Sequence, residues 1–190
     1  MRNLFLILMV CFIFVPTVFA QKSNNLETSD ANKILWEIRM NPEDTSEQKE
    51  SERWSYFLTN DLGSYGYDKD SIKFVKDNNG KRDLNLIEVE TKTLFLNKEI
   101  IENLNKKRFS EKLSKGDSVN SCDIRMIFNR QDKTYTTTNM IVYAKSGKIL
   151  QNKSFKKPFV LIPEESFAQA MYEELENYYS LHKVKMLRGK

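Results

Sequence analysis

The residues best suited to nucleophilic or metal chemistry are scarce in this sequence. It contains two cysteines, Cys11 and Cys122, and a single histidine, His182. A nucleophilic thiolate needs a neighbouring base, and His182 lies in a basic C-terminal stretch far along the chain from Cys122. One histidine and one internal cysteine leave only carboxylates to bind a metal, and no Asp-x-Asp-x-Asp loop is present. We therefore expect no enzymatic activity, no metal site and no cofactor.

Asp68 and Asp70 are the carboxylates whose spacing most resembles a site. They lie two residues apart in the stretch Tyr-Asp-Lys-Asp-Ser, which would suit an acid–base pair or one corner of a calcium site. Aspartates in such a stretch more commonly hold a turn, because their side chains accept hydrogen bonds from nearby backbone N–H groups. We interpret both as turn residues, and the sequence has no glycine-rich phosphate loop.

Two clusters of basic residues are candidates for binding a polyanion or an acidic protein surface. The first cluster is Lys106, Lys107 and Arg108, with Lys112 and Lys115 following it, and the second is Lys183, Lys185, Arg188 and Lys190. The alternative is a solvated loop and a frayed terminus. The net charge of +4, or +3 without Arg2, is too small to indicate a nucleic-acid partner.

The N-terminus has the layout of a secretory signal peptide. Arg2 precedes an apolar run over residues 4–14, and small residues follow at positions suited to cleavage between Ala20 and Gln21. The run is too short for a typical membrane anchor and is followed by Pro16, although an uncleaved anchor remains the alternative. A lipoprotein site at Cys11 fits poorly, so we expect Cys11 to be removed with the signal. No later stretch is apolar enough to span a membrane, which predicts an exported protein of the periplasm, cell surface or medium.

The remaining chain divides into three parts. Residues 21–52 are polar and acidic around one apolar patch, KILWEIRM, and we interpret them as a leader or linker in which that patch docks on the body as a short helix or strand. Residues 53–182 have the patterning of one folded domain, and residues 183–190 form a basic tail.

Apolar residues recur with a period of two from Arg53 onward, which is typical of strands with one buried face. Trp54, Tyr56 and Leu58 form the first such set, and the segments 87–95, 122–128, 135–143 and 149–155 continue the pattern. Asp77-Asn78-Asn79-Gly80 and Lys145-Ser146-Gly147-Lys148 are predicted hairpin turns, and Asn97 is a predicted cap of a short helix. Short turns between consecutive strands favour an antiparallel meander.

A long C-terminal helix follows the strands. Ser166-Phe167-Ala168-Gln169 matches a capping box, and Phe167, Ala170, Met171, Leu175 and Tyr178 then form one apolar stripe. Lys183 and Lys185 are placed just beyond the end of this helix. The stripe must pack on the sheet to be buried, so the predicted fold is α+β, with a five- or six-stranded antiparallel sheet and the C-terminal helix on one face.

The order of several short motifs resembles the surface-adhesin protein E family of bacterial envelope proteins. The motifs are a strand opened by Trp54, a Tyr-Asp-x-x-Ser-Ile segment, a strand cysteine, a Tyr…Gly hairpin and a Pro-x-x-Ser helix start, and the matching positions include Trp54, Tyr67, Asp68, Ser71, Ile72, Cys122, Tyr143, Gly147, Pro163 and Ser166. The resemblance covers about residues 53–178. It implies an exported or lipid-anchored protein with a C-terminal helix packed on the concave face of an antiparallel sheet.

In that family the strand cysteine forms a disulfide with a cysteine near the end of the final helix, and this chain departs from the pattern. No cysteine lies between Phe167 and Lys190, so Cys122 has no partner within the chain once Cys11 is removed. Because Cys122 shares a strand face with Ile124, Met126 and Phe128, we expect it to be buried as a small apolar side chain. An exposed thiol that joins two chains in a homodimer is the alternative.

The best-studied members of the family bind host matrix components such as vitronectin and laminin. The resemblance therefore implies a non-enzymatic envelope protein that recognises matrix-type proteins at the cell surface. A periplasmic binding or accessory module, with an internal protein or small-molecule partner, is the alternative, because the sequence shows no lipid anchor.

Overall fold

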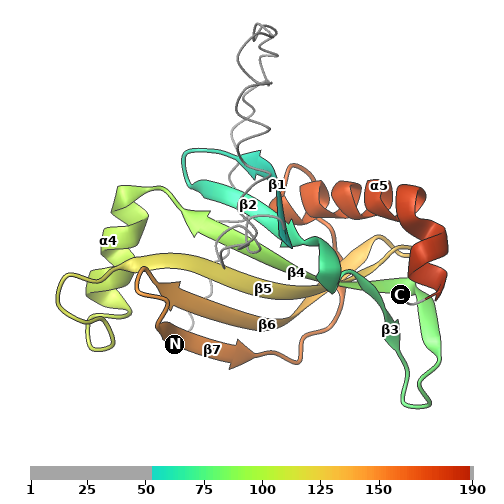
Figure 1. The fold of residues 1–190 in the computed structure, drawn as a ribbon, viewed down its shortest axis with the longest axis horizontal. Coiled ribbons are helices and arrows are strands. Elements are labelled where there is room, and N and C mark those ends of the chain that lie inside the picture. The colour runs from blue at the N-terminus through green and yellow to red at the C-terminus, as the bar shows by residue number, and fades with distance from the viewer. Residues whose placement is uncertain (1–52, 189–190) are drawn as a thin grey trace, which may run out of the picture.

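A single open antiparallel sheet with helices at one face and one end makes up the described part of this protein (Figure 1). The computed structural model describes residues 53–188. In chain order the elements are β1 (Trp54–Thr59), β2 (Gly63–Asp68), the 3-10 helix η2 (Lys69–Ser71), β3 (Lys73–Lys76), β4 (Arg82–Phe95), α4 (Lys98–Lys107), β5 (Val119–Asn129), β6 (Thr134–Ala144), β7 (Ile149–Ser154), β8 (Val160–Leu161) and α5 (Phe167–Arg188). The predicted α+β class is confirmed. The predictions for the signal peptide, Cys11 and the leader concern residues 1–52, outside the described range.

The sheet has eight strands rather than the five or six predicted. Six of them follow the order β1-β2-β4-β5-β6-β7, while β3 pairs with β4 and β8 pairs with β6. The two additional strands are short, and β8 contains only Val160 and Leu161. Such short strands carry too few residues to produce a clear period-two pattern, so they are not among the predicted strands.

The predicted turns and the first helix cap are confirmed. Asp77 closes the β3–β4 hairpin by accepting hydrogen bonds from the backbone N–H groups of Asn79 and Lys81, and Gly80 there has a φ of 77°. Gly147 has a φ of 84° in the β6–β7 hairpin. Both glycines occupy the left-handed region that side chains disfavour. Asn97 caps α4 by accepting a hydrogen bond from Ile100 N.

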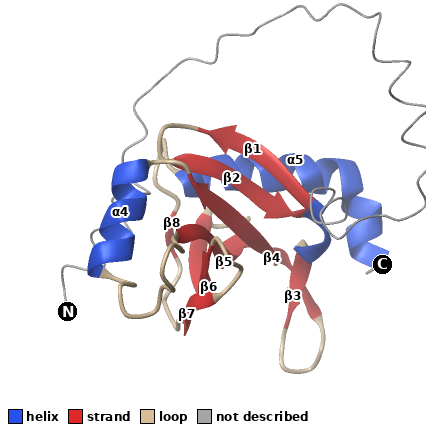
Figure 2. Ribbon diagram, turned by 60° about the vertical axis from the view of Figure 1, so that its left-hand side comes forward, coloured by secondary structure: helices blue, strands red, loops and turns tan. Residues whose placement is uncertain are grey.

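Alternation along the central strands separates a buried face from a charged face. On β4, Ile87, Val89 and Thr91 are almost fully buried, whereas Glu88 and Glu90 lie on the other side. The register pairs these buried residues with a matching set on β5, Phe128, Met126 and Ile124. Helix α5 lies across this face (Figures 1 and 2), and its Phe167, Ala168, Met171 and Leu175 join the same core.

The first strand departs from the predicted alternation. The pairing register of β1 with β2 shifts between Tyr56 and Leu58, so Phe57 is an extra residue in a β-bulge. Phe57 contacts the rings of Tyr67 and Phe167 and therefore packs on the helix side. The prediction that Trp54, Tyr56 and Leu58 share one face is wrong, because the bulge moves the residues that follow it to the opposite face.

Helix α5 begins at a capped turn and extends further than predicted. Ser166 Oγ accepts a hydrogen bond from Gln169 N, while Gln169 Oε1 accepts one from Glu165 N rather than from the cap residue itself. The helix continues to Arg188, so Lys183 and Lys185 are helical residues and the predicted start of a basic tail at residue 183 is wrong. The reason is tertiary: Met186 is buried, and Arg82 Nη1 donates to Leu187 O at 2.6 Å. Within residues 53–188 no helix has the length and apolar character needed to cross a membrane.

Candidate functional site

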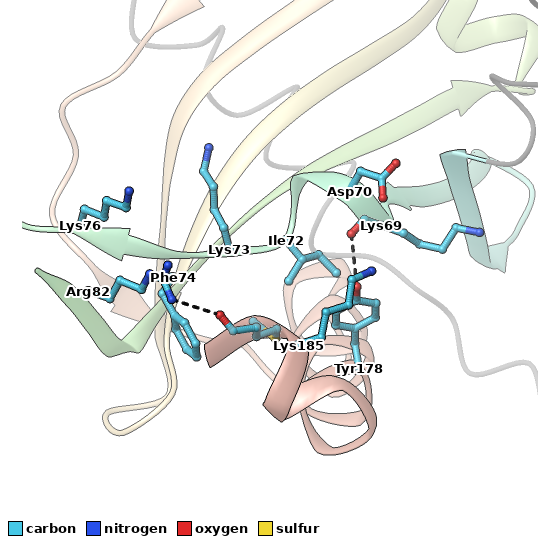
Figure 3. Close-up of a pocket in the computed structure, with 10 residues that line it drawn as sticks. Lys69, Asp70, Ile72, Lys73, Phe74, Lys76, Arg82, Tyr178 and Lys185 are labelled. Atoms are coloured by element: carbon cyan, nitrogen blue, oxygen red, sulfur yellow. Dashed lines mark hydrogen bonds between the residues drawn. The ribbon is translucent and has the colours of Figure 1, made fainter. Parts of the chain in front are cut away.

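A pocket of about 320 Å³ lies where β3 and η2 face the last turns of α5 (Figure 3). Its position follows from the local fold: the chain leaves β2, turns through η2 and enters β3, and α5 crosses beneath this bend. The lining side chains are Lys69, Asp70, Ile72, Lys73, Phe74, Lys76, Arg82, Tyr178, Lys185 and Met186. We call this the β3–α5 pocket.

Positive charge dominates the β3–α5 pocket. Five of its ten lining residues are lysine or arginine, and Asp70 is the single acidic residue among them. Two of the five cations are already engaged, because Lys73 Nζ lies 3.0 Å from Glu88 Oε1 and Arg82 donates to the carbonyl groups at the end of α5. The three others, Lys69, Lys76 and Lys185, are exposed and have no ion pair within residues 53–188.

The floor of the pocket is apolar and well anchored. Ile72, Phe74 and Met186 are buried, and the ring of Phe74 meets the ring of Tyr179 edge-on. The Tyr178 hydroxyl donates to Lys69 O at 3.5 Å, which joins α5 to η2. Burial raises the pKa of the Tyr178 hydroxyl, and the nearby Asp70 carboxylate raises this pKa further. The arrangement is an apolar base with exposed ammonium groups above it, which suits binding of an anionic group.

A second hollow of about 280 Å³ lies beside the first and has a different charge balance. Its lining includes Arg53, Lys73 and Arg125 together with Asp68, Asp70, Ser71, Glu88 and Glu90. Its charges largely compensate one another: Arg53 Nε donates to Asp68 Oδ2 at 2.6 Å, and both Arg53 and Arg125 lie 3.7 Å from Glu90. This hollow therefore offers little net attraction for a charged ligand.

The two basic clusters singled out from the sequence lie at opposite ends of the sheet (Figures 1 and 2). Of the C-terminal cluster, Lys185 lines the β3–α5 pocket, whereas Lys183 lies over the Tyr179 ring and Arg188 is exposed in the last turn of α5. The structure thus brings only one of these predicted residues into the pocket.

The other cluster, around α4, is largely engaged in internal contacts. Lys106 pairs with Glu102 within α4, and Arg108 Nη2 donates to Gln151 at 3.2 Å. Lys112 Nζ donates to Leu150 O and so joins the segment after α4 to β7, while Lys107 is exposed at the end of the helix. These contacts give part of the cluster a structural role.

Most of the cations of the pocket were not among the predicted site residues. Lys69, Lys73, Lys76 and Arg82 are spread over three elements, η2, β3 and β4, so they do not form a run in the sequence. One signal was available: a hairpin at Asp77–Gly80 places Lys76 opposite Arg82, and this pairing is present in the register. That signal does not reveal Lys185, which is more than 100 residues away.

The positions that carry the family resemblance have structural roles around the β2–η2 bend. Asp68 is buried, its Oδ1 accepts from Asp70 N, and its backbone carbonyl accepts from Ser71 Oγ. Ser71 Oγ in turn accepts from Glu90 N, which joins the bend to β4. Tyr67 and Ile72, on either side of the bend, are buried in the core. The interpretation is therefore confirmed for Asp68, whose carboxylate accepts from a backbone N–H group, while Asp70 lies in the same turn and donates that N–H.

The remaining positions of the resemblance are also structural. Trp54 is buried with the ammonium group of Lys92 4.2 Å from its ring centre, and Pro163 O accepts from Ser166 Oγ ahead of α5. Cys122 is only 3% exposed, which confirms the predicted burial of its thiol in the core. This burial contradicts the alternative of an exposed thiol that joins two chains.

Comparison with solved structures includes a distant structural likeness. No protein-family model and no curated protein matches the sequence. Among solved structures, the chain is similar to protein E of Haemophilus influenzae, with 16% sequence identity and a TM-score of 0.38. The alignment covers 60% of this chain and 81% of that chain.

Proposed function

We propose that this chain is an exported, non-enzymatic protein of the bacterial cell envelope that recognises an acidic segment of a protein partner at the β3–α5 pocket. The observation that carries the proposal is the placement of three exposed lysines without ion pairs in the described range, Lys69, Lys76 and Lys185, above an apolar floor. An acidic peptide would supply the missing counter-charges, and its apolar side chains could contact Ile72 and Phe74 at the base.

The proposal that the chain is exported rests on the signal-like N-terminus, in which Arg2, an apolar run and Ala20 occur in the order of a cleaved leader. Membership of the surface-adhesin protein E family is also proposed, on the order of the motifs from Trp54 to Ser166. Together they favour a partner outside the cell, of the matrix-protein type. A periplasmic module that binds an internal protein through the same pocket is the second candidate.

Location is tested by protease treatment of intact cells that produce this chain, with blotting for the chain and for a periplasmic marker. We expect the chain to be digested while the marker stays intact. Protection of the chain until the outer envelope is opened would contradict surface exposure and favour the periplasmic candidate.

Recognition is tested by binding of the purified chain to immobilised matrix proteins. The test variant replaces Lys69, Lys76 and Lys185 with glutamine, and the matched control replaces Lys106, Lys107 and Lys115, which removes the same charge at the other end of the sheet. We expect only the test variant to lose binding. Equal losses from the two variants would show attraction to overall charge and would contradict recognition at this pocket.

A further inference from the structure

We infer that the acidic stretch at residues 41–52 of this chain docks in the β3–α5 pocket and occupies it in competition with the partner. This inference rests on the proposed function of the pocket and adds a regulatory contact within the same chain. The stretch reads NPEDTSEQKESE and contains five acidic residues and one basic residue.

Charge complementarity between the two parts of the chain is the first argument. Residues 1–52 contain five of the 30 basic and eight of the 26 acidic residues, which leaves 25 basic and 18 acidic residues in 53–190. Residues 53–190 therefore have a net charge of +7, whereas residues 41–52 have a net charge of −4. Opposite charges of this size attract over roughly one Debye length, about 8 Å at physiological salt.

The point at which the chain enters the described structure is the second argument. Arg53 is held at the β2–η2 bend by its ion pair with Asp68, beside the second hollow, which shares Asp70 and Lys73 with the β3–α5 pocket. Trp54 lies opposite Asp68 in the β1–β2 register, and Lys69 of the pocket follows Asp68 directly. The acidic stretch is therefore tethered beside the pocket that its charges fit.

The length of the tether is sufficient. The ten residues from Glu43 to Glu52 span up to about 33–36 Å when extended, because each residue contributes about 3.3–3.6 Å. A connection of this length gives an effective concentration on the order of millimolar, so even a weak contact is substantially populated.

The choice of the β3–α5 pocket over the α4 cluster follows from the contacts each cluster makes. Around α4, Lys106 and Lys112 are engaged by Glu102 and by a backbone carbonyl, and the cluster lies at the other end of the sheet from η2 (Figure 1). In the pocket, Lys69, Lys76 and Lys185 have no acidic partner within residues 53–188. Of these two clusters, the pocket is therefore the one beside the point where the acidic stretch joins the described structure, because Lys69 follows the Asp68 that pairs with Arg53.

Zero-length cross-linking of the exported chain tests the contact directly. A carbodiimide joins a carboxylate to a lysine amine only where the two groups touch, and the exported chain retains residues 41–52 whether or not its first 20 residues are removed. We expect links from Glu43, Asp44, Glu47, Glu50 or Glu52 to Lys69, Lys76 or Lys185. The absence of such links, or equally frequent links to Lys107 and Lys115, would overturn the inference.

A second measurement tests the competition. The probe is a labelled peptide of ten glutamates, and the variant replaces three leader acids: Glu43→Gln, Asp44→Asn and Glu47→Gln. The matched control makes the same charge change upstream, with Glu27→Gln, Asp30→Asn and Glu37→Gln. We expect at least about threefold tighter binding of the probe by the leader variant and no comparable gain by the control. If probe affinity rises equally in the leader variant and the control, the gain comes from net charge alone, and the inference is overturned.

The outcomes separate the inference from the function on which it rests. If replacing Lys69, Lys76 and Lys185 abolishes probe binding while no cross-links to the leader form, the pocket function stands and the leader contact is wrong. If the cross-links form but probe binding does not depend on these lysines, the leader contact stands and the proposed function is wrong.

Discussion

The ion pair between Arg130 and Glu176 joins the sheet to helix α5, and its geometry predicts how much stability is lost when the pair is removed. Arg130 Nε and Nη2 donate to the two carboxylate oxygens of Glu176 at 2.5 and 2.8 Å, and the side chains are only 21% and 34% exposed. The Glu176 carboxylate raises the pKa of Arg130 above its ordinary value, although partial burial acts in the opposite direction. The Arg130 guanidinium also lies 3.7 Å from the centre of the Tyr179 ring.

The coupling free energy between Arg130 and Glu176 is expected to lie between that of a surface ion pair and that of a buried one. Exposed ion pairs contribute about 0.2–1 kcal/mol, and hydrogen bonds to charged groups contribute about 1.5–3 kcal/mol. For a two-pronged pair that is mostly but not fully buried, we expect a coupling free energy of about 1–2 kcal/mol. At about 2–4 °C per kcal/mol for a chain of this size, breaking it would lower the Tm by about 2–8 °C.

A double-mutant cycle measures this coupling. The variants are Arg130→Met, which keeps an aliphatic stem against Tyr179, Glu176→Gln and their combination, with the free energy of unfolding obtained from urea titrations. The cation–π contact with Tyr179 is lost in both variants that carry Arg130→Met, with Glu176 or with its glutamine replacement. Its contribution therefore cancels in the cycle. The control cycle is Glu102 with Lys106, a pair with 65% and 76% exposed side chains, for which we expect no more than about 0.5 kcal/mol. A coupling below about 0.3 kcal/mol for Arg130 and Glu176 would refute this view of how α5 is held.

Three further outcomes follow from packing and electrostatics. Met171→Ala removes a fully buried side chain under α5 and should lower the free energy of unfolding by about 2–5 kcal/mol in urea titrations; a loss below about 1 kcal/mol would mean that the helix is not docked. Gly63→Ala should cost about 1–3 kcal/mol in the same titrations, because its Cβ would overlap the Leu94 carbonyl oxygen, whereas an unchanged stability would contradict that close approach. Hydrogen bonds from Ser146 hold the pKa of Asp117 below its usual range, so its ionised form stabilises the fold above about pH 4 and this contribution is lost as the pH falls through the lowered pKa. Asp117→Asn should therefore lower the Tm at pH 7 by an amount that disappears as the pH falls below the lowered pKa, and a constant difference across pH would contradict the assignment.

The central strands and the start of α5 could be predicted because their signals are local. A period of two over Ile87, Val89 and Thr91 requires only that one face of the strand be buried, and the structure buries that face. Ser166 and Gln169 mark the helix start through hydrogen bonds within four residues. The burial of Cys122 follows from its apolar neighbours on the same strand face.

The features that were missed depend on contacts between distant segments. The bulge at Phe57 is set by packing against Phe167, 110 residues away, and no local pattern indicates it. The last turns of α5 persist because Arg82 and the buried Met186 hold them, although the sequence there resembles a basic tail. The pocket was missed for the same reason, since its cations converge only when β3 and α5 are brought together.

The affinity of the ten-glutamate peptide for this chain, measured as a function of salt, tests recognition at the β3–α5 pocket most directly. The comparison is between the chain with its natural lysines, the variant that replaces Lys69, Lys76 and Lys185 with glutamine, and the control that replaces Lys106, Lys107 and Lys115. Each is measured with the natural leader and with Glu43, Asp44 and Glu47 neutralised, so that competition from the leader does not mask binding. At about 0.5 kcal/mol for each lost ammonium contact, the pocket variant should bind about tenfold more weakly, while the control stays within about twofold. Equal affinities of the two variants, or no binding by the chain with its natural lysines in either background, would contradict recognition at this pocket.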